Sequence, residues 1–178
     1  MKRHTENIIR LLILSALLTT SASLKAYPTH YNMIGKSELT VLWFNIYQAQ
    51  LWGPTTSNNL SSDRSAIIRP PLLLKLSYQR NISRKKLLSH TQEQLNQHVG
   101  SNQLSKWLQQ LSGFLPNINK GDELAFHQVN QNLGKFYYQK KFIGEINDNM
   151  FAQRFINIWL DDDSEYPEQA KQLTGKQP

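Results

Sequence analysis

The order of the apolar segments between residues 72 and 160 constrains the fold most strongly. A buried-strand pattern, Leu72–Tyr78, is followed by two amphipathic helical stripes, then by short strand-like runs and a third apolar helix. The stripes repeat at three- and four-residue spacing, whereas the strand-like runs are rich in β-branched and aromatic residues. This succession of strand and helix patterns predicts an α+β domain.

Capping and helix-breaking residues mark the predicted helix ends. Ser83 is a good N-cap residue for the first helix, and Gly100 is expected to end that helix. Pro116 is expected to stop the second helix and Asp148 to cap the third. A last short helix is predicted over residues 167–173.

Nearer the N-terminus, residues 39–52 are β-branched and aromatic. They predict either one long strand or a tight pair of strands, which Gly53 and Pro54 would end. Residues 55–65 are rich in Ser, Asn and Thr and predict an exposed loop.

The start of the chain has the layout of a secretory signal peptide. Lys2, Arg3 and Arg10 form a basic region, which precedes the apolar run 11–18 and a stretch of small residues. The apolar run is shorter than the roughly 20 residues that a membrane-spanning helix needs. No further transmembrane segment is predicted.

Cleavage is expected after Ala26, with a cut after Ser23 as the alternative. The predicted organisation is therefore a signal peptide over residues 1–26 and a single domain over 27–178, with its core at about 35–175. An uncleaved N-terminal anchor is a second possibility, because neither site is a clean Ala-x-Ala.

Charge and composition indicate an ordinary exported globular domain. The formal charge is +7, but the predicted leader holds four of the 20 basic residues and one of the 13 acidic ones, which leaves +4. The remaining Lys and Arg are scattered rather than clustered among aromatic residues, so no nucleic-acid partner is predicted. The chain contains no Cys, so it must be stable without disulfides.

Five motifs, taken in order, resemble the bacterial chalcone isomerase-like domain. They are Phe44-x-Ile46-Tyr47-x-Ala49-x-Leu51-Trp52, Tyr78-x-Arg80-x-Ile82-Ser83, Phe114-Leu115-Pro116 with Lys120-Gly121-Asp122, Phe136-Tyr137 before Gly144-Glu145-Ile146, and Phe155-x-x-Ile158-Trp159-Leu160. The resemblance spans residues 35–175. It implies one large antiparallel β-sheet packed by a layer of α-helices, with a cleft between the two layers. The predicted signal peptide implies that the domain is exported to the periplasm.

The resemblance also implies where catalytic groups would stand. Isomerases of this fold use an Arg and a Thr on early strands, and a Tyr, a Lys and an Asn on the first helix of the cleft. In this chain Leu87, His90 and Gln94 take the three helix positions. Leu42 takes the Thr position, and Lys36 is nearest to the Arg. Because a Leu can neither donate a hydrogen bond to a carbonyl nor order a water, we expect no ring-closing activity, no catalytic residue and no cofactor.

The function favoured at this point is non-enzymatic binding of a small apolar or fatty-acid-like ligand in the cleft. Non-catalytic members of the fold resemble fatty-acid-binding proteins, in which a cation and a hydroxyl hold a carboxylate. Lys36 is the predicted charge partner, with Tyr47, His90 or Gln94 as neutral donors. The plainer interpretations are a surface lysine, a core tyrosine and a solvated helix edge.

Two other functions are left open. The first is an envelope scaffold whose cleft is filled by its own side chains, so that Trp43, Trp52, Phe136 and Tyr138 would plug the cleft rather than line it. The second is an isomerase-type enzyme with His90 as general base.

No metal site is predicted. His90 and His98 lack a third ligand, and Asp161–Asp163 lacks the ligand spacing of a calcium loop.

Overall fold

The structure, a computed structural model, describes residues 27–41, 44–54 and 68–175. Within these residues, six antiparallel strands form one sheet in sequence order. The strands are β1 (Tyr31–Val41), β2 (Phe44–Pro54), β3 (Leu72–Tyr78), β4 (Glu123–Gln128), β5 (Leu133–Tyr138) and β6 (Lys141–Asn147). Helices α2 (Arg84–Leu95) and α3 (Ser101–Phe114) connect β3 to β4, whereas α4 (Phe151–Leu160) and α5 (Pro167–Thr174) follow β6.

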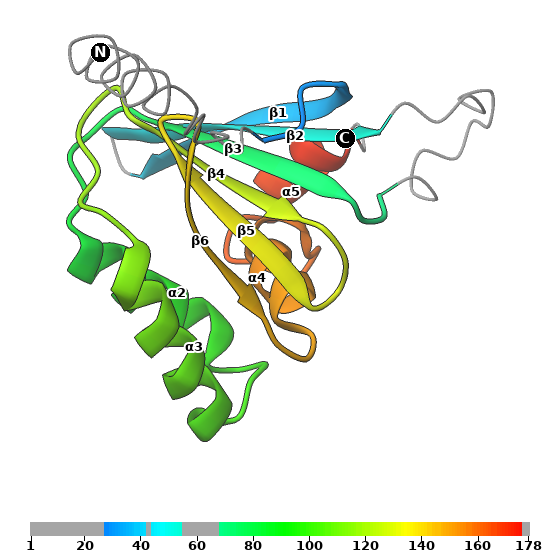
Figure 1. The fold of residues 1–178 in the computed structure, drawn as a ribbon. Coiled ribbons are helices and arrows are strands. Elements are labelled where there is room, and N and C mark those ends of the chain that lie inside the picture. Colours follow the sequence, from blue (N-terminus) through cyan, green and yellow to red (C-terminus); the bar gives the residue numbers. More distant parts are fainter. Residues whose placement is uncertain (1–26, 42–43, 55–67, 176–178) are drawn as a thin grey trace, which may run out of the picture.

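The helices lie on one side of the sheet, with the α2–α3 hairpin toward one end and α4 and α5 toward the other (Figure 1). We call the helix-covered side the inner face and the opposite side the outer face. Successive side chains of a strand point to opposite faces. In β3, Leu74 and Leu76 therefore point to the inner face, whereas Leu73 and Lys75 point to the outer one.

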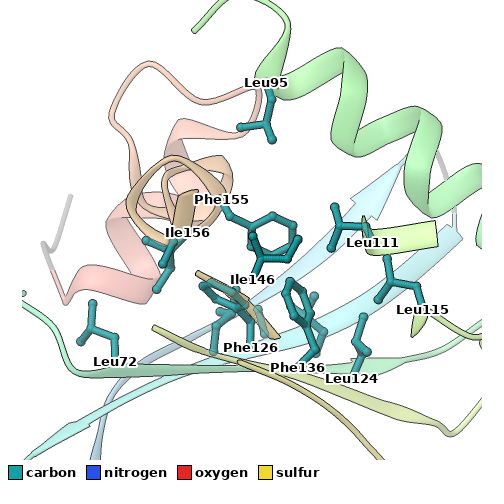
Figure 2. Close-up of a cluster of buried hydrophobic side chains, with 14 of the residues drawn as sticks. Leu72, Leu95, Leu111, Leu115, Leu124, Phe126, Phe136, Ile146, Phe155 and Ile156 are labelled. Atoms are coloured by element: carbon teal, nitrogen blue, oxygen red, sulfur yellow. The ribbon is translucent and has the colours of Figure 1, made fainter. Parts of the chain in front are cut away.

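The main core lies between the inner face and the helices. Figure 2 shows Phe126 and Phe136 of the sheet facing Phe155 of α4, with Leu111 and Leu115 from the end of α3 beside them. The ring centroid of Phe155 lies 4.6 Å from that of Phe126 and 5.1 Å from that of Phe136. The three rings thus join the sheet to the helical layer.

A glycine lets α5 lie directly on the edge strand β1. A Cβ atom at Gly35 would stand 2.3 Å from the backbone oxygen of Gln172 and 2.4 Å from that of Leu173. No other residue fits this position without moving the helix.

The predicted fold class is confirmed as α+β, an antiparallel sheet with a helical layer on one face. Residues 72–78 form a strand, Ser83 is the N-cap of α2, and α3 ends before Pro116 as predicted. Residues 39–52 contribute to a strand pair rather than to one long strand, and the first strand already begins at Tyr31. The predicted signal peptide and the predicted loop at 55–65 lie outside the described residues, as do Leu42 and Trp43.

Two predicted caps are wrong. Helix α2 ends at Leu95, where an exposed turn follows, and Gly100 is instead the N-cap of α3. Asp148 does not cap α4, which begins after Met150. Its carboxylate instead accepts hydrogen bonds from side chains of α3, namely Gln103, Lys106 and Trp107.

Candidate functional site

A cavity of about 280 Å³ lies between the inner face and helices α2 and α4. Its wall is mostly apolar and is drawn from strands, helices and connecting segments. The apolar lining residues are Leu39, Val41, Ile46, Leu74, Leu76, Ile82, Leu87, Leu115, Leu124, Phe126, Phe136, Phe155 and Ile158. Val41 is exposed, as are the polar lining residues Lys86 and His90, so these three mark the mouth.

Tyr47 contributes a hydroxyl group that the protein itself already uses. The hydroxyl accepts a hydrogen bond of 2.9 Å from Trp159 Nε1 and donates one of 3.3 Å to Gln169 Oε1. Burial raises the pKa of Tyr47 to about 12, so the phenol is neutral at physiological pH. Tyr47 thus ties β2 to α4 and α5 at the cavity wall.

Tyr78, at the end of β3, contributes a second hydroxyl. Its ring meets that of Tyr47 edge to face, with the centroids 5.7 Å apart. Burial raises the pKa of Tyr78, so this phenol is also neutral. Among the described residues, no side chain or backbone group forms a hydrogen bond with the Tyr78 hydroxyl. Because Tyr78 lines the cavity, its hydroxyl, which has no such partner, is available to a ligand.

The start of α2 makes the mouth basic. Lys86 and His90 are one helical turn apart and both line the cavity. Lys86 has no ion pair within the described part of the chain, whereas His90 Nδ1 lies 3.9 Å from a Glu93 carboxylate oxygen. The first turn of α2 carries no acidic residue, although a helix N-terminus favours negative charge. An anion at the mouth would meet the lysine.

The structure brings together two of the four residues that the sequence proposed as ligand contacts. Tyr47 and His90 line the cavity. Gln94 lies in a neighbouring polar groove, where its amide donates a hydrogen bond of 2.5 Å to Glu165. Lys36 pairs with Gln50 across β1 and β2, is exposed, and is not among the lining residues. Ligand contact by any of the four stays a prediction.

Sequence reasoning missed Lys86, the cation at the mouth. The family pattern places functional side chains at positions 87, 90 and 94 of this helix, and Lys86 lies one residue before the first of them. Its spacing of four from His90, beside the apolar stripe that begins with Leu87, was the available signal. Leu87 itself lines the cavity and brings no hydroxyl there.

The aromatic residues that could either line the cleft or plug it lie in different places in the structure. Phe136 lines the cavity, and Trp52 packs on the outer face. Tyr138 donates a hydrogen bond to Asp122 and does not line the cavity. The cleft is therefore not plugged by Trp52 or Tyr138.

Within the described ranges, no cluster of three or more His, Cys, Asp or Glu side chains is arranged to hold a metal ion. Nor does any helix of these ranges have the length and apolar character needed to cross a bilayer.

The sequence model of a family described as chalcone isomerase-like matches residues 20–171. The chain belongs to this family. An uncharacterized protein of Haemophilus influenzae is 27% identical over 150 residues, which cover 83% of this chain and 69% of that protein.

Among solved structures, the crystal structure of a fatty-acid binding protein of Arabidopsis thaliana is similar to this chain with a TM-score of 0.60. Its sequence identity is 8%, and the match covers 85% of this chain and 90% of the plant protein. At this identity the similarity is one of fold. The resemblance to the chalcone isomerase-like family and its fold is thereby confirmed.

Proposed function

We propose that this chalcone isomerase-like protein binds a small apolar acid in the inner-face cavity, without catalysing a reaction, after export to the periplasm. The proposal rests on three features that occur together in one cavity. Its wall is apolar, its mouth holds the unpaired Lys86, and its interior holds the partnerless Tyr78 hydroxyl.

The lining matches the two parts of such a ligand. Leu74, Leu76 and the phenylalanine rings would surround a hydrocarbon tail, whose removal from water drives binding. The Lys86 ammonium would form a charge-assisted hydrogen bond with the carboxylate, and His90 stands one turn away. The similar fold of the Arabidopsis thaliana fatty-acid binding protein supports an acyl acid as the class of ligand.

The first test is native mass spectrometry of the protein purified from the periplasm without detergent. Any bound small molecule is then extracted and identified. A stoichiometric apolar acid would support the proposal. A ligand-free mass, from a protein that also takes up no added acid, would overturn it and favour a scaffold role.

The second test compares two neighbouring lysines by calorimetric titration with decanoate. Lys86→Met should weaken binding by about 10- to 100-fold, because a hydrogen bond to a charged group contributes about 1.5–3 kcal/mol. Lys85→Met is the matched control, since Lys85 lies on the same helix and is exposed but does not line the cavity. Equal effects of the two changes would refute a specific role for Lys86.

The proposal of export rests on the N-terminal layout and on Tyr27. This residue follows the predicted cleavage site, and its ring is buried against Tyr137, with the centroids 5.7 Å apart. The folded domain thus includes the first residue after the expected cut. Intact mass measurement of the periplasmic protein should give a chain that begins at Tyr27, or at Leu24 if cleavage follows Ser23. A chain that retains residues 1–23 would refute cleavage.

A further inference from the structure

We infer that three phenylalanine rings close the deep end of the cavity, and that this floor limits the length of the acyl chain that the cavity can hold. The rings belong to Phe126 on β4, Phe136 on β5 and Phe155 on α4. The inference rests on the proposed function and adds to it the length of the ligand and the residues that set this length.

The three rings form a continuous surface. Their centroids are 5.0 Å apart between Phe126 and Phe136, 4.6 Å between Phe126 and Phe155, and 5.1 Å between Phe136 and Phe155. All three line the cavity, yet they are only 4%, 1% and 6% exposed, in that order. Figure 2 shows Phe155 facing the two sheet residues. Their burial contrasts with the exposure of the mouth residues Lys86 and His90, which would hold the carboxylate.

A second layer prevents the floor from moving back. The Phe151 ring is completely buried, and its centroid lies 6.4 Å from that of Phe126, 6.2 Å from that of Phe136 and 5.6 Å from that of Phe155. The backbone at Gly134 also meets the Phe126 ring closely, since a Cβ atom there would lie 2.4 Å from it. Because interiors are packed this tightly, a longer tail cannot push the rings aside without displacing their neighbours.

The depth of the cavity then limits the chain length. Each methylene that enters an apolar site adds about 0.8 kcal/mol, which is about a fourfold gain in affinity. Affinity should therefore rise with chain length until the floor is reached. Further carbons would remain at the mouth in water and add little.

The test titrates the full purified protein with straight-chain acids of even carbon number, from hexanoate to palmitate, by calorimetry. Affinity should rise about fourfold with each added methylene up to a limiting length and then level off. Phe155→Leu should move this limit to longer acids by about one or two carbons, because a smaller side chain deepens the cavity. Phe155→Met is the second variant in case the first does not fold.

Phe151→Leu is the matched control. Phe151 lies one turn before Phe155 on α4 and belongs to the same ring cluster, but it does not line the cavity. Because Phe151 stands behind the floor rather than in it, its replacement should lower stability and move the length limit by less than Phe155→Leu does. A wild-type affinity that keeps rising to palmitate would overturn the inference, as would equal limits for the two leucine variants. Absence of binding at every length would instead refute the proposed function, and the wild-type series requires no variant to fold.

Discussion

The two faces of the sheet differ in whether their polar groups have partners within the protein. On the outer face, the Lys75 ammonium lies 4.8 Å from the ring centroid of Tyr27 and 4.3 Å from that of Trp52. The Tyr27 hydroxyl donates a hydrogen bond of 2.9 Å to Glu123. On the inner face, by contrast, Tyr78 and Lys86 border a cavity and have no such partners within the described residues.

The difference lies in what covers each apolar surface. Tyr27 and Tyr31, at the start of the described chain, fill the outer cluster with the protein's own side chains. No described side chain fills the inner cavity, although packed interiors leave few voids of that size. This contrast supports the proposed ligand site on the inner face. The following experiments test this contrast.

The largest effect is expected from filling the cavity. Leu87→Trp would place a large ring at a lining position and should weaken acid binding by about a hundredfold or more, since the ring displaces several methylene groups of the tail. Leu88→Trp is the matched control, because Leu88 packs against the core but does not line the cavity. Calorimetric titration measures both variants. Unchanged affinity in Leu87→Trp would place the ligand elsewhere.

Removing the Tyr27 ring from the outer face should lower stability and leave acid affinity unchanged. Tyr27→Ala loses the ring contacts with Tyr137 and Lys75 and should lower the free energy of unfolding by about 3 kcal/mol. Tyr27→Phe loses only the hydrogen bond to Glu123 and should cost about 1 kcal/mol. Urea unfolding measures both losses. Acid affinity should stay at the wild-type value in the folded proteins, and a parallel loss of affinity would show that the two faces are not independent.

His127, on the outer face, should make the stability of the protein depend on pH. Burial, with a smaller effect of the Lys135 charge, lowers the pKa of His127 from 6.5 to about 4. Between these two pH values, the His127 imidazole binds a proton in the unfolded chain but stays neutral in the folded protein. Stability should fall by up to about 2 kcal/mol as the pH is lowered from about 6.5 to 4.

Urea unfolding at pH 7.5, 5.5 and 4.5 measures this fall, and His127→Gln should reduce it. The Asp148 carboxyl contributes mainly below this window, because its hydrogen bond with Lys106 lowers its pKa from 3.8 to about 2. An equal pH dependence in wild type and His127→Gln would exclude His127 as the source. Acid affinity at pH 7.5 should be the same in both proteins.

The order of strands and helices could be predicted from sequence because it depends on periodicity. The run Leu72–Tyr78 is apolar on both faces, as expected of an inner strand of the sheet, and the stripe of α3 is buried at Leu104, Trp107 and Leu111. The end of α2 was harder to predict, since Val99 continues the apolar pattern beyond the last helical turn.

The site was less predictable because it depends on register. Lys36 was the expected cation, but the pairing of β1 with β2 shifts between Met33 and Gly35, and such an irregularity changes which side chains face inward. Sequence spacing cannot locate this shift. The partnerless state of Tyr78 is likewise a property of its neighbours in space, and Tyr47 and Tyr78 look equally like core residues in the sequence.

The smallest effect, and the sharpest comparison, concerns these two tyrosines. Tyr78→Phe should leave the free energy of unfolding within about 0.5 kcal/mol of the wild-type value, because its hydroxyl has no protein partner to lose. The same change should weaken acid binding by roughly 3- to 10-fold, the effect of one hydrogen bond. Urea unfolding and calorimetric titration of the same preparation measure the two quantities.

Tyr47→Phe should show the opposite balance. It leaves Trp159 Nε1 and Gln169 Oε1 without their partner, so its cost should appear in stability, at about 1–3 kcal/mol. If Tyr78→Phe is destabilised as much as Tyr47→Phe, its hydroxyl serves the protein and the contrast between the two faces is weaker than inferred. If Tyr78→Phe instead binds acids as tightly as wild type, Lys86 and the apolar wall hold the ligand without it. Only a variant that keeps its stability and loses affinity identifies the Tyr78 hydroxyl as a ligand donor.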